Sequence, residues 1–192
     1  RKGLKWSDGT PHTSADFRWW WDYHVTNKEI TPAISTQVST LDAEGTRVMG
    51  TLETPDDFTV VYKFVSPYPL FGFNVLGHGN QPYRPGWFMQ QYHMDLVEDK
   101  DALAAAATAA GFNTWADYYN DRDLWYLNPE RPTTDPWMAK NPLSEELFIM
   151  ERNPYFWQVD EEGQQLPYID TVNHRLFETP DVFNLWIVNG EI

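Results

Sequence analysis

The segment from Lys2 to Phe17 constrains the fold of this chain more than any other stretch. Leu4 and Trp6 alternate with polar neighbours, which predicts a short half-buried strand. Residues 7–10 then read Ser-Asp-Gly-Thr, and they predict a tight turn because their glycine accepts a positive φ. Thr13–Asp16 has the spacing of a capping box, in which each end residue bonds the other's backbone N–H. A helix is therefore expected to begin directly after this turn.

The expected helix carries a strongly aromatic face. Phe17, Trp20, Trp21 and His24 recur at the spacing of one helical side. Helical geometry sends consecutive tryptophans in different directions, so we expect Trp20 and Trp21 to pack in the core rather than to stack on a ligand. On the same side, His24 is expected to be a packed, hydrogen-bonded histidine. An irregular loop over residues 31–35 should follow.

The rest of the chain mixes both kinds of secondary structure. A β-hairpin is expected over residues 46–65, with Val48 and Leu52 in its first strand, because residues 58–65 are β-branched and aromatic throughout. The strand expected at residues 146–152 has a central apolar run, so we expect it to be buried on both faces. The fold class is therefore α/β in the broad sense of a mixed α+β domain. The other expected elements are strands at 146–152 and 171–177 and helices at 87–94, 99–110, 114–119 and 179–188.

Composition excludes several classes of function. The 28 acidic residues against 14 basic ones give a net charge of −14, which opposes binding to nucleic acid or to an anionic membrane surface. The absence of cysteine excludes disulfides and thiolate chemistry. His93 lacks a partner at helical spacing, and no Gly-Lys-Ser/Thr follows the glycine-rich loop near residue 79. No metal and no cofactor are therefore expected.

The two ends of the sequence suggest a fragment. The chain begins at Arg1, inside the first expected strand, and stops at Ile192, just after an expected helix ends at Gly190. We therefore expect a piece of a longer protein, and the missing signal peptide is uninformative about location.

Several blocks together resemble the family 5 extracellular solute-binding proteins, the peptide, nickel and oligosaccharide receptors of ABC importers. Their signature runs basic, apolar, Lys-Trp-Ser-Asp-Gly-x-Pro-x-Thr-Ala-x-Asp-Phe/Val, and residues 2–17 follow it closely. Residues 133–137 depart from the family pattern, because they keep only the proline and the aromatic residue of its Gly-Thr/Asn-Gly-Pro/Ala-Tyr/Phe turn. The later blocks that match the family, in the family's order, are residues 54–60, 151–157, 166–172 and 179–192.

The resemblance implies a fragment of the type II periplasmic binding protein fold. Residues 1–85 would form a small subdomain, and residues 86–192 part of the main lobe with a helical elaboration at 95–125. It also implies a non-enzymatic receptor that captures a peptide or an oligosaccharide between two lobes and delivers it to the transmembrane subunits of the ABC permease. The implied location is periplasmic or extracellular, with anchoring as a lipoprotein included.

The resemblance also implies a ligand-binding set and no catalytic residue. In peptide-binding members, the loop after the first helix places an aromatic residue, just beyond a proline, against the ligand. Here Pro32 is followed by Ala33 and Ile34, so that contact would be weakened or replaced. A family histidine contact falls within one position of His78, which follows Gly77 in the later loop.

Two other classes of protein stay open at this point. A fragment of a carbohydrate-active hydrolase would need two carboxylates about 5–10 Å apart across a cleft, for example Asp56 or Glu151 facing another acid in an aromatic pocket. A purely structural interaction module would expose a large apolar patch and have no concave site.

If the chain is part of a receptor, its aromatic content of 16% slightly favours a saccharide as the ligand.

Overall fold

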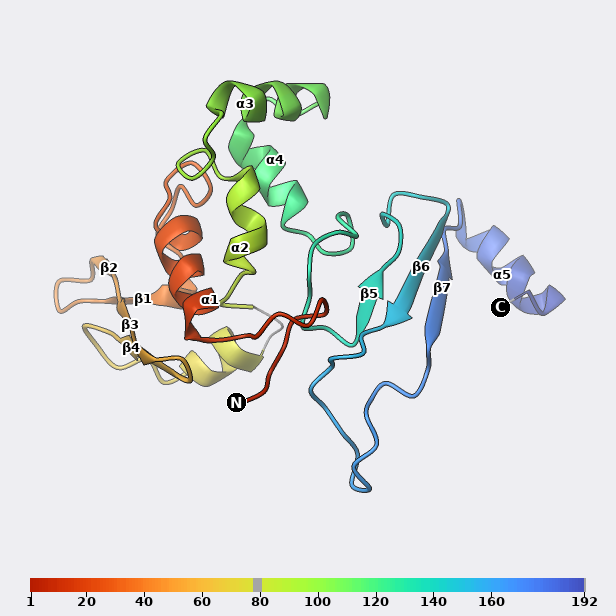
Figure 1. Cartoon of the computed structure of the whole chain (residues 1–192), viewed down its shortest axis with the longest axis horizontal. Coiled ribbons are helices and arrows are strands. Elements are labelled where there is room, and N and C mark those ends of the chain that lie inside the picture. Colours follow the sequence, from red (N-terminus) through yellow and green to blue (C-terminus); the bar gives the residue numbers. More distant parts are fainter. Residues whose placement is uncertain (78–80, 192) are drawn as a thin grey trace.

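The computed structural model describes residues 1–77 and 81–191. One body of the molecule holds most of the helices and two small hairpins, and a three-stranded sheet followed by the last helix extends to one side (Figure 1). This is the mixed helix-and-sheet fold predicted from the sequence. None of the helices in the described ranges is long and apolar enough to cross a membrane.

The turn and the capped helix near the N-terminus form as predicted, but the strand before them does not. Thr13 caps helix α1 (Ser14–Trp19), and Thr13 and Asp16 exchange both bonds of the capping box. In place of a strand there is one isolated bridge between Lys5 and Pro11, because the turn reverses the chain immediately after it. Trp6 is nevertheless 0% exposed, so the segment is anchored by its side chain rather than by a sheet.

The tryptophans of the first helix pack in the core, as predicted. Helix α1 continues directly into a π-helical stretch, η1 (Trp20–Val25). Trp20 and Trp21 are buried together with Val38 and Leu52 in one apolar cluster. The ring of His24 stacks beside Trp20, and its Nδ1 atom lies 3.2 Å from the Tyr119 hydroxyl, so His24 is packed and hydrogen-bonded as expected.

The expected single hairpin over residues 46–65 is wrong, because two hairpins occupy this region. Val48 lies in β2, which pairs with β1, whereas Leu52 lies in β3, which pairs with β4. The break falls at Gly50, whose backbone passes so close to Lys63 that a Cβ atom would lie 2.7 Å from the Lys63 carbonyl oxygen. The strand bounds are β1 Ser39–Leu41, β2 Arg47–Met49, β3 Thr51–Asp56 and β4 Thr59–Lys63.

A second apolar cluster joins the helices of the middle of the chain to the first helix and the segment that follows it. Ile30 packs there with Met89, Trp115 and Tyr119, which all follow residue 85. The division of the chain at residue 85 stays a prediction. The helix capped by Thr114 runs to Arg122, three residues beyond its expected end. The helices of this region are η2 Thr36–Val38, η3 Gly72–Gly77, α2 Gly86–Met89, η4 Gln90–Tyr92, α3 Lys100–Ala109 and α4 Trp115–Arg122.

The C-terminal sheet is antiparallel in the order β5 (Trp137–Ala139), β6 (Leu147–Arg152), β7 (Thr171–Arg175). The expected burial of β6 on both faces is wrong for this chain, since only Phe148 of that strand is buried. The reason is that helix α5 (Pro180–Asn189) continues away from the sheet and does not form a second layer over it (Figure 1). The cap at the start of α5 and the left-handed glycine at its end form as predicted.

Three separate motifs meet where the sheet joins the helical body. The Ser7 N–H donates to the Thr133 carbonyl at 2.9 Å, and the Thr133 N–H donates back to Ser7 Oγ at 3.0 Å. Asn153, which is 0% exposed, donates its backbone N–H to the Pro136 carbonyl at 2.8 Å and its Nδ2 to the Asp135 carbonyl at 2.9 Å. These four bonds tie the N-terminal turn, the turn at 133–137 and the end of β6 into one junction.

Gly9 supplies the close approach at this junction, and its replacement provides a test. At φ +90°, a Cβ on Gly9 would lie 3.1 Å from the Tyr155 ring, whereas a Cβ on Gly45 at φ +82° would meet nothing within 4 Å. We predict that Gly45→Ala costs about 1–2 kcal/mol for the left-handed backbone alone. Gly9→Ala should cost about 1–3 kcal/mol more, because the ring must shift. Urea denaturation measures both, and equal losses would show that the contact with Tyr155 contributes nothing.

His12 and Asp16 form a buried pair behind the capping box. His12 Nδ1 lies 3.9 Å from Asp16 Oδ2, and both side chains are largely hidden from water. Burial lowers the pKa of His12 to about 4. Burial likewise raises the pKa of Asp16 to about 6, against the opposing hydrogen bond from the Thr13 N–H.

These two pKa shifts predict opposite effects of pH on stability. As the pH falls from 6.5 to about 4, the unfolded chain protonates His12 before the folded one does, so the folded state loses stability. As the pH falls from about 6 to 3.8, the folded chain protonates Asp16 first, so the folded state gains stability. We predict that His12→Gln becomes more stable relative to the wild type toward pH 4, whereas Asp16→Asn becomes less stable. Unfolding free energies measured from pH 4 to 7 test this, and differences that do not vary with pH would contradict it.

Candidate functional site

Two neighbouring cavities share a wall made by Gln81 and Arg84. The larger, of about 280 Å³, lies on the side of Asp123 and Arg131. The smaller, of about 130 Å³, lies on the side of His24 and the loop at 31–35. The remaining lining residues are Leu124, Trp125 and Asp135 in the larger cavity, and Trp20, Val25, Thr31, Ser35 and Gln37 in the smaller.

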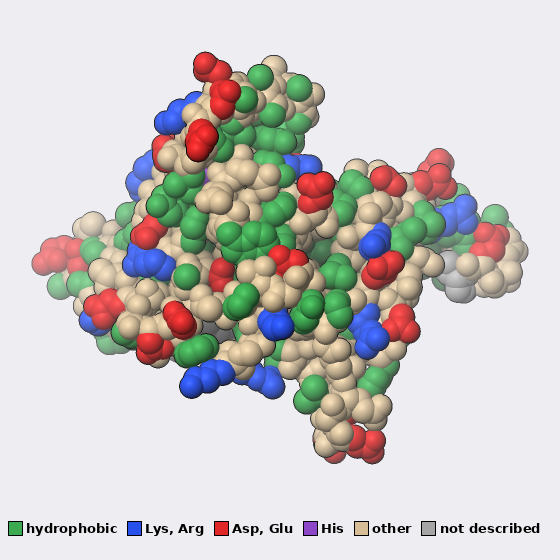
Figure 2. Space-filling view, viewed as in Figure 1, with side chains coloured by type: hydrophobic (Ala, Val, Ile, Leu, Met, Phe, Trp, Pro, Cys, Tyr) green, Lys and Arg blue, Asp and Glu red, His purple; other side chains and the backbone are tan. Residues whose placement is uncertain are grey.

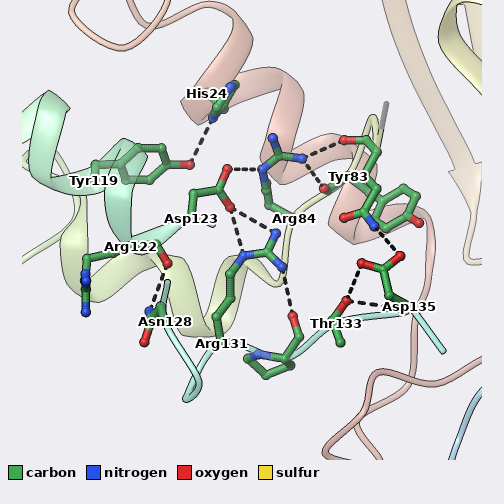
Figure 3. Close-up of polar contacts among 12 residues, drawn as sticks. His24, Tyr83, Arg84, Tyr119, Arg122, Asp123, Asn128, Arg131, Thr133 and Asp135 are labelled. Atoms are coloured by element: carbon green, nitrogen blue, oxygen red, sulfur yellow. Dashed lines mark hydrogen bonds and ion pairs between the residues drawn. The ribbon is translucent and has the colours of Figure 1, made fainter. Parts of the chain in front are cut away.

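The shared wall is held by a buried cluster of three charges (Figure 3). Asp123 accepts the Nε–H of Arg84 on one carboxylate oxygen and the Nε–H of Arg131 on the other, the latter at 3.0 Å. Arg84 Nη1 also donates to the carbonyl oxygens of Gln81, at 2.6 Å, and Tyr83, at 2.8 Å. These bonds fix the Arg84 guanidinium group between the two cavities.

The electrostatics of this cluster follow from burial and from the surplus of cations. Burial alone would raise the pKa of Asp123, but the coulombic attraction of Arg84 and Arg131 outweighs it and holds that pKa below its ordinary value. Burial, followed by repulsion from Arg84, lowers the pKa of His24 to about 3, so its ring is neutral at physiological pH. The hydrogen-bonded cluster therefore holds two guanidinium groups and one carboxylate, and a second carboxylate, that of Asp135, lines the larger cavity beside them. Elsewhere on the face shown in Figure 2, acidic side chains are spread over many elements rather than gathered in one patch.

Three of the five sequence-predicted site residues lie in a loop whose ends line the smaller cavity. Pro32 and Ala33 are exposed and Ile34 is half-buried in the loop whose flanking residues, Thr31 and Ser35, line that cavity. Gly77 is exposed at the end of η3, and His78 lies outside the described residues. The contact of these five residues with a ligand stays a prediction.

Sequence reasoning missed Arg84, Asp123 and Arg131. All three lie at helix ends or in irregular segments, 39 and 8 positions apart, with no periodic pattern linking them. Only the fold brings them together. The sequence offers one local indication, the Pro-rich connection over residues 127–136, but nothing in its pattern predicts that its arginine is buried.

The hydrolase alternative is not supported. Asp56 is exposed and accepts the Phe58 N–H at 2.8 Å within its turn. Glu151 pairs with Lys140 at 3.2 Å on an exposed strand. Neither faces another carboxylate in an aromatic pocket. Within residues 1–77 and 81–191 no group of three His, Asp or Glu side chains is placed to hold a metal ion, and the two cavities contradict a structural module without a concave site.

The fold corresponds to that of a class of extracellular binding proteins. The family model described as bacterial extracellular solute-binding proteins, family 5, middle, matches residues 1–192. This chain belongs to that family.

The similar proteins include both peptide and saccharide receptors. A solved structure of the oligopeptide-binding protein OppA is 36% identical with a TM-score of 0.84, over 100% of this chain and 29% of that one. The periplasmic alpha-galactoside-binding protein of Rhizobium meliloti (strain 1021) is 27% identical over 175 residues, 91% of this chain and 22% of its own length. The periplasmic binding protein MelB of Agrobacterium fabrum C58, solved with stachyose, shares the fold at 23% identity and a TM-score of 0.62, over 98% of this chain and 25% of that one. This chain therefore spans less than a third of each of these relatives.

The three-charge cluster predicts a large difference between buried and exposed ion pairs. Asp123→Asn would leave two guanidinium groups, of which Arg131 is 5% exposed, without a countercharge, and we expect a loss of about 3–5 kcal/mol. Asp22→Asn breaks a pair with Arg18 that is substantially exposed, and should cost less than about 1 kcal/mol. Guanidinium chloride denaturation compares the two variants. Similar losses would mean that water reaches the cluster freely.

Proposed function

We propose that this chain is part of the extracytoplasmic receptor of an ABC importer, which captures a peptide or an oligosaccharide. The observation that carries the proposal is the family match over residues 1–192. The identity of 36% to an oligopeptide-binding protein supports a peptide, and the relative that binds alpha-galactosides supports a saccharide. Binding of this kind uses hydrogen bonds and aromatic contacts and breaks no covalent bond.

In this proposal the ligand lies between two lobes that close around it, and this chain supplies part of one wall. The small coverage of the relatives' length supports a wall rather than a whole site, because the largest fraction of a relative covered among the three is 29%. The uncovered apolar side chains at the C-terminal end support the same conclusion. These exposed side chains are Leu176, Phe177, Leu185, Ile187 and Val188.

The finer parts of the proposal concern location, partners and contacts. The receptor acts in the periplasm or outside the cell, free or anchored as a lipoprotein, and passes its ligand to the transmembrane subunits of the permease. It is not an enzyme. Residues 1–85 form the small subdomain and residues 86–192 part of the main lobe. Pro32, Ala33, Ile34, Gly77 and His78 face the ligand.

Isothermal titration calorimetry on the full-length protein tests this proposal. The titrants are a pool of di- to pentapeptides and a pool of neutral and acidic oligosaccharides. Saturable heat with one pool and not the other assigns the ligand class. No heat with either pool would overturn the proposal.

The loop after the first helix gives a more local prediction. Ala33 is exposed, so a larger side chain fits there without disturbing the core. We predict that Ala33→Tyr restores an aromatic contact and tightens binding of the captured ligand by about 3- to 10-fold. Ala43→Tyr, at an exposed alanine in the turn between β1 and β2, is the matched control and should leave affinity unchanged. Equal affinities for both variants and the wild type would place the ligand away from residue 33.

A further inference from the structure

The smaller cavity is cationic in an otherwise strongly acidic protein. Among the described residues that line it, Arg84 is the only one with a formal charge, since His24 is neutral and none of these residues is an aspartate or a glutamate. The larger cavity differs, because Asp123 and Asp135 stand there beside the two arginines. The chain as a whole carries a net charge of −14, so the positive cavity runs against its average.

Arg84 is held with one donor group unused. Its Nε and Nη1 atoms are committed to Asp123 and to the carbonyls of Gln81 and Tyr83. Among the described residues, Nη2 has no hydrogen bond, and it lies on the side of the helix that carries His24 (Figure 3). The guanidinium group is thus fixed in place before any ligand arrives, which reduces the entropy cost of binding.

The remaining polar groups of the cavity complement an acceptor. Ser35 Oγ accepts the Gln37 backbone N–H at 3.2 Å, so its own hydrogen is available to donate. The Gln37 side chain adds an amide donor to the same wall. Guanidinium, hydroxyl and amide donors around one space suit a carboxylate, which has only acceptors.

The size of the cavity limits what can enter it. Its volume of about 130 Å³ is well below the roughly 300–1,000 Å³ of sites that hold a whole drug-sized ligand. It is also several times the roughly 30 Å³ of one water molecule. It therefore accommodates a terminal group, with the rest of the ligand lying outside it.

We propose that the cavity between Arg84, Ser35 and Gln37 binds the carboxylate of the transported ligand, so that this receptor selects anionic ligands. This inference rests on the proposed function and narrows it. The carboxylate belongs to the C-terminus of a peptide or to an acidic sugar. A neutral oligosaccharide would leave the guanidinium donor without a partner.

The test compares matched ligand pairs on the full-length wild-type protein by isothermal titration calorimetry. One pair is tri-alanine and its C-terminal amide, and the other is tri-galacturonic acid and neutral galactotriose. One charge-assisted contact predicts that the acid of the captured class binds about 10- to 100-fold tighter than its neutral partner. Binding in the peptide pair identifies a C-terminal carboxylate as the source, and binding in the sugar pair identifies a uronate.

Two variants then assign the effect to this cavity. Gln37→Ala removes a lining donor outside the charge cluster and should reduce the acid-to-neutral ratio about 3- to 10-fold, whereas Gln90→Ala, on an exposed helix elsewhere, should not change it. Arg84→Lys keeps the charge but cannot bond Asp123 and the Gln81 and Tyr83 carbonyls while offering a further fixed donor, so the ratio should fall as well. Thermal unfolding checks that this variant folds. Equal binding of acid and neutral partners, or a ratio that Gln37→Ala leaves unchanged, overturns the carboxylate site while the proposed function stands. Absence of binding by all four compounds overturns both.

Discussion

The buried residue Asn153 connects the C-terminal sheet to the turn at 133–137, and the arrangement of the two parts of the molecule depends on this connection. Its backbone N–H and Nδ2 donate to the turn at 133–137, and its Oδ1 accepts the Tyr155 N–H at 2.9 Å. The turn it fixes is in turn bonded to Ser7. Since buried backbone carbonyls are costly to leave unpaired, the positions of the N-terminal turn and of the C-terminal sheet depend on this amide. The helical body and the sheet are thereby connected through hydrogen bonds, in addition to the contact of Phe148 with Trp125, and neither of the two apolar clusters of the helical body includes a residue of the sheet.

The charge cluster around Asp123 also fixes distant segments relative to one another, in this case through ion pairs. Two arginines from different segments share one carboxylate, and each also donates to backbone carbonyls beside it. Such an arrangement adds little stability compared with apolar packing, but removing Asp123 leaves two buried guanidinium groups without their partner. The cluster instead fixes the orientation of the Arg84 side chain. Arg84 is held at the wall of two cavities in one position, which a surface arginine would not be.

Local features of this fold could be predicted from the sequence, and features that depend on distant segments could not. The helix starts at Thr13 and Thr179 followed from capping chemistry within four residues, and the burial of Trp20 and Trp21 followed from helical spacing. The sequence predicts one hairpin over residues 46–65 where the fold has two. The break at Gly50 depends on its close approach to Lys63, which is a tertiary contact. Burial of β6 was overestimated, because an apolar strand does not reveal whether a second layer covers it.

The candidate site shows the same division. The loop at 31–35 was singled out through a family resemblance, and it does lie beside a cavity. The charged wall of that cavity cannot be predicted from the sequence, because Arg84 and Asp123 lie 39 positions apart and meet only when α4 packs against the first helix and the segment after it. A buried ion pair leaves no trace in residue spacing.

The exposed apolar strip on α5, formed by Leu185, Ile187 and Val188, has a consequence for handling the polypeptide. Val188 is 82% exposed, and the neighbouring Leu185 and Ile187 are more than half exposed on the same short helix. A polypeptide limited to residues 1–192 would present this strip to water beside an unpaired sheet edge at β7, a combination that promotes self-association. Its oligomers would then reflect a missing neighbour rather than a biological assembly, and hydrophilic substitutions at these three positions would restore a monodisperse preparation.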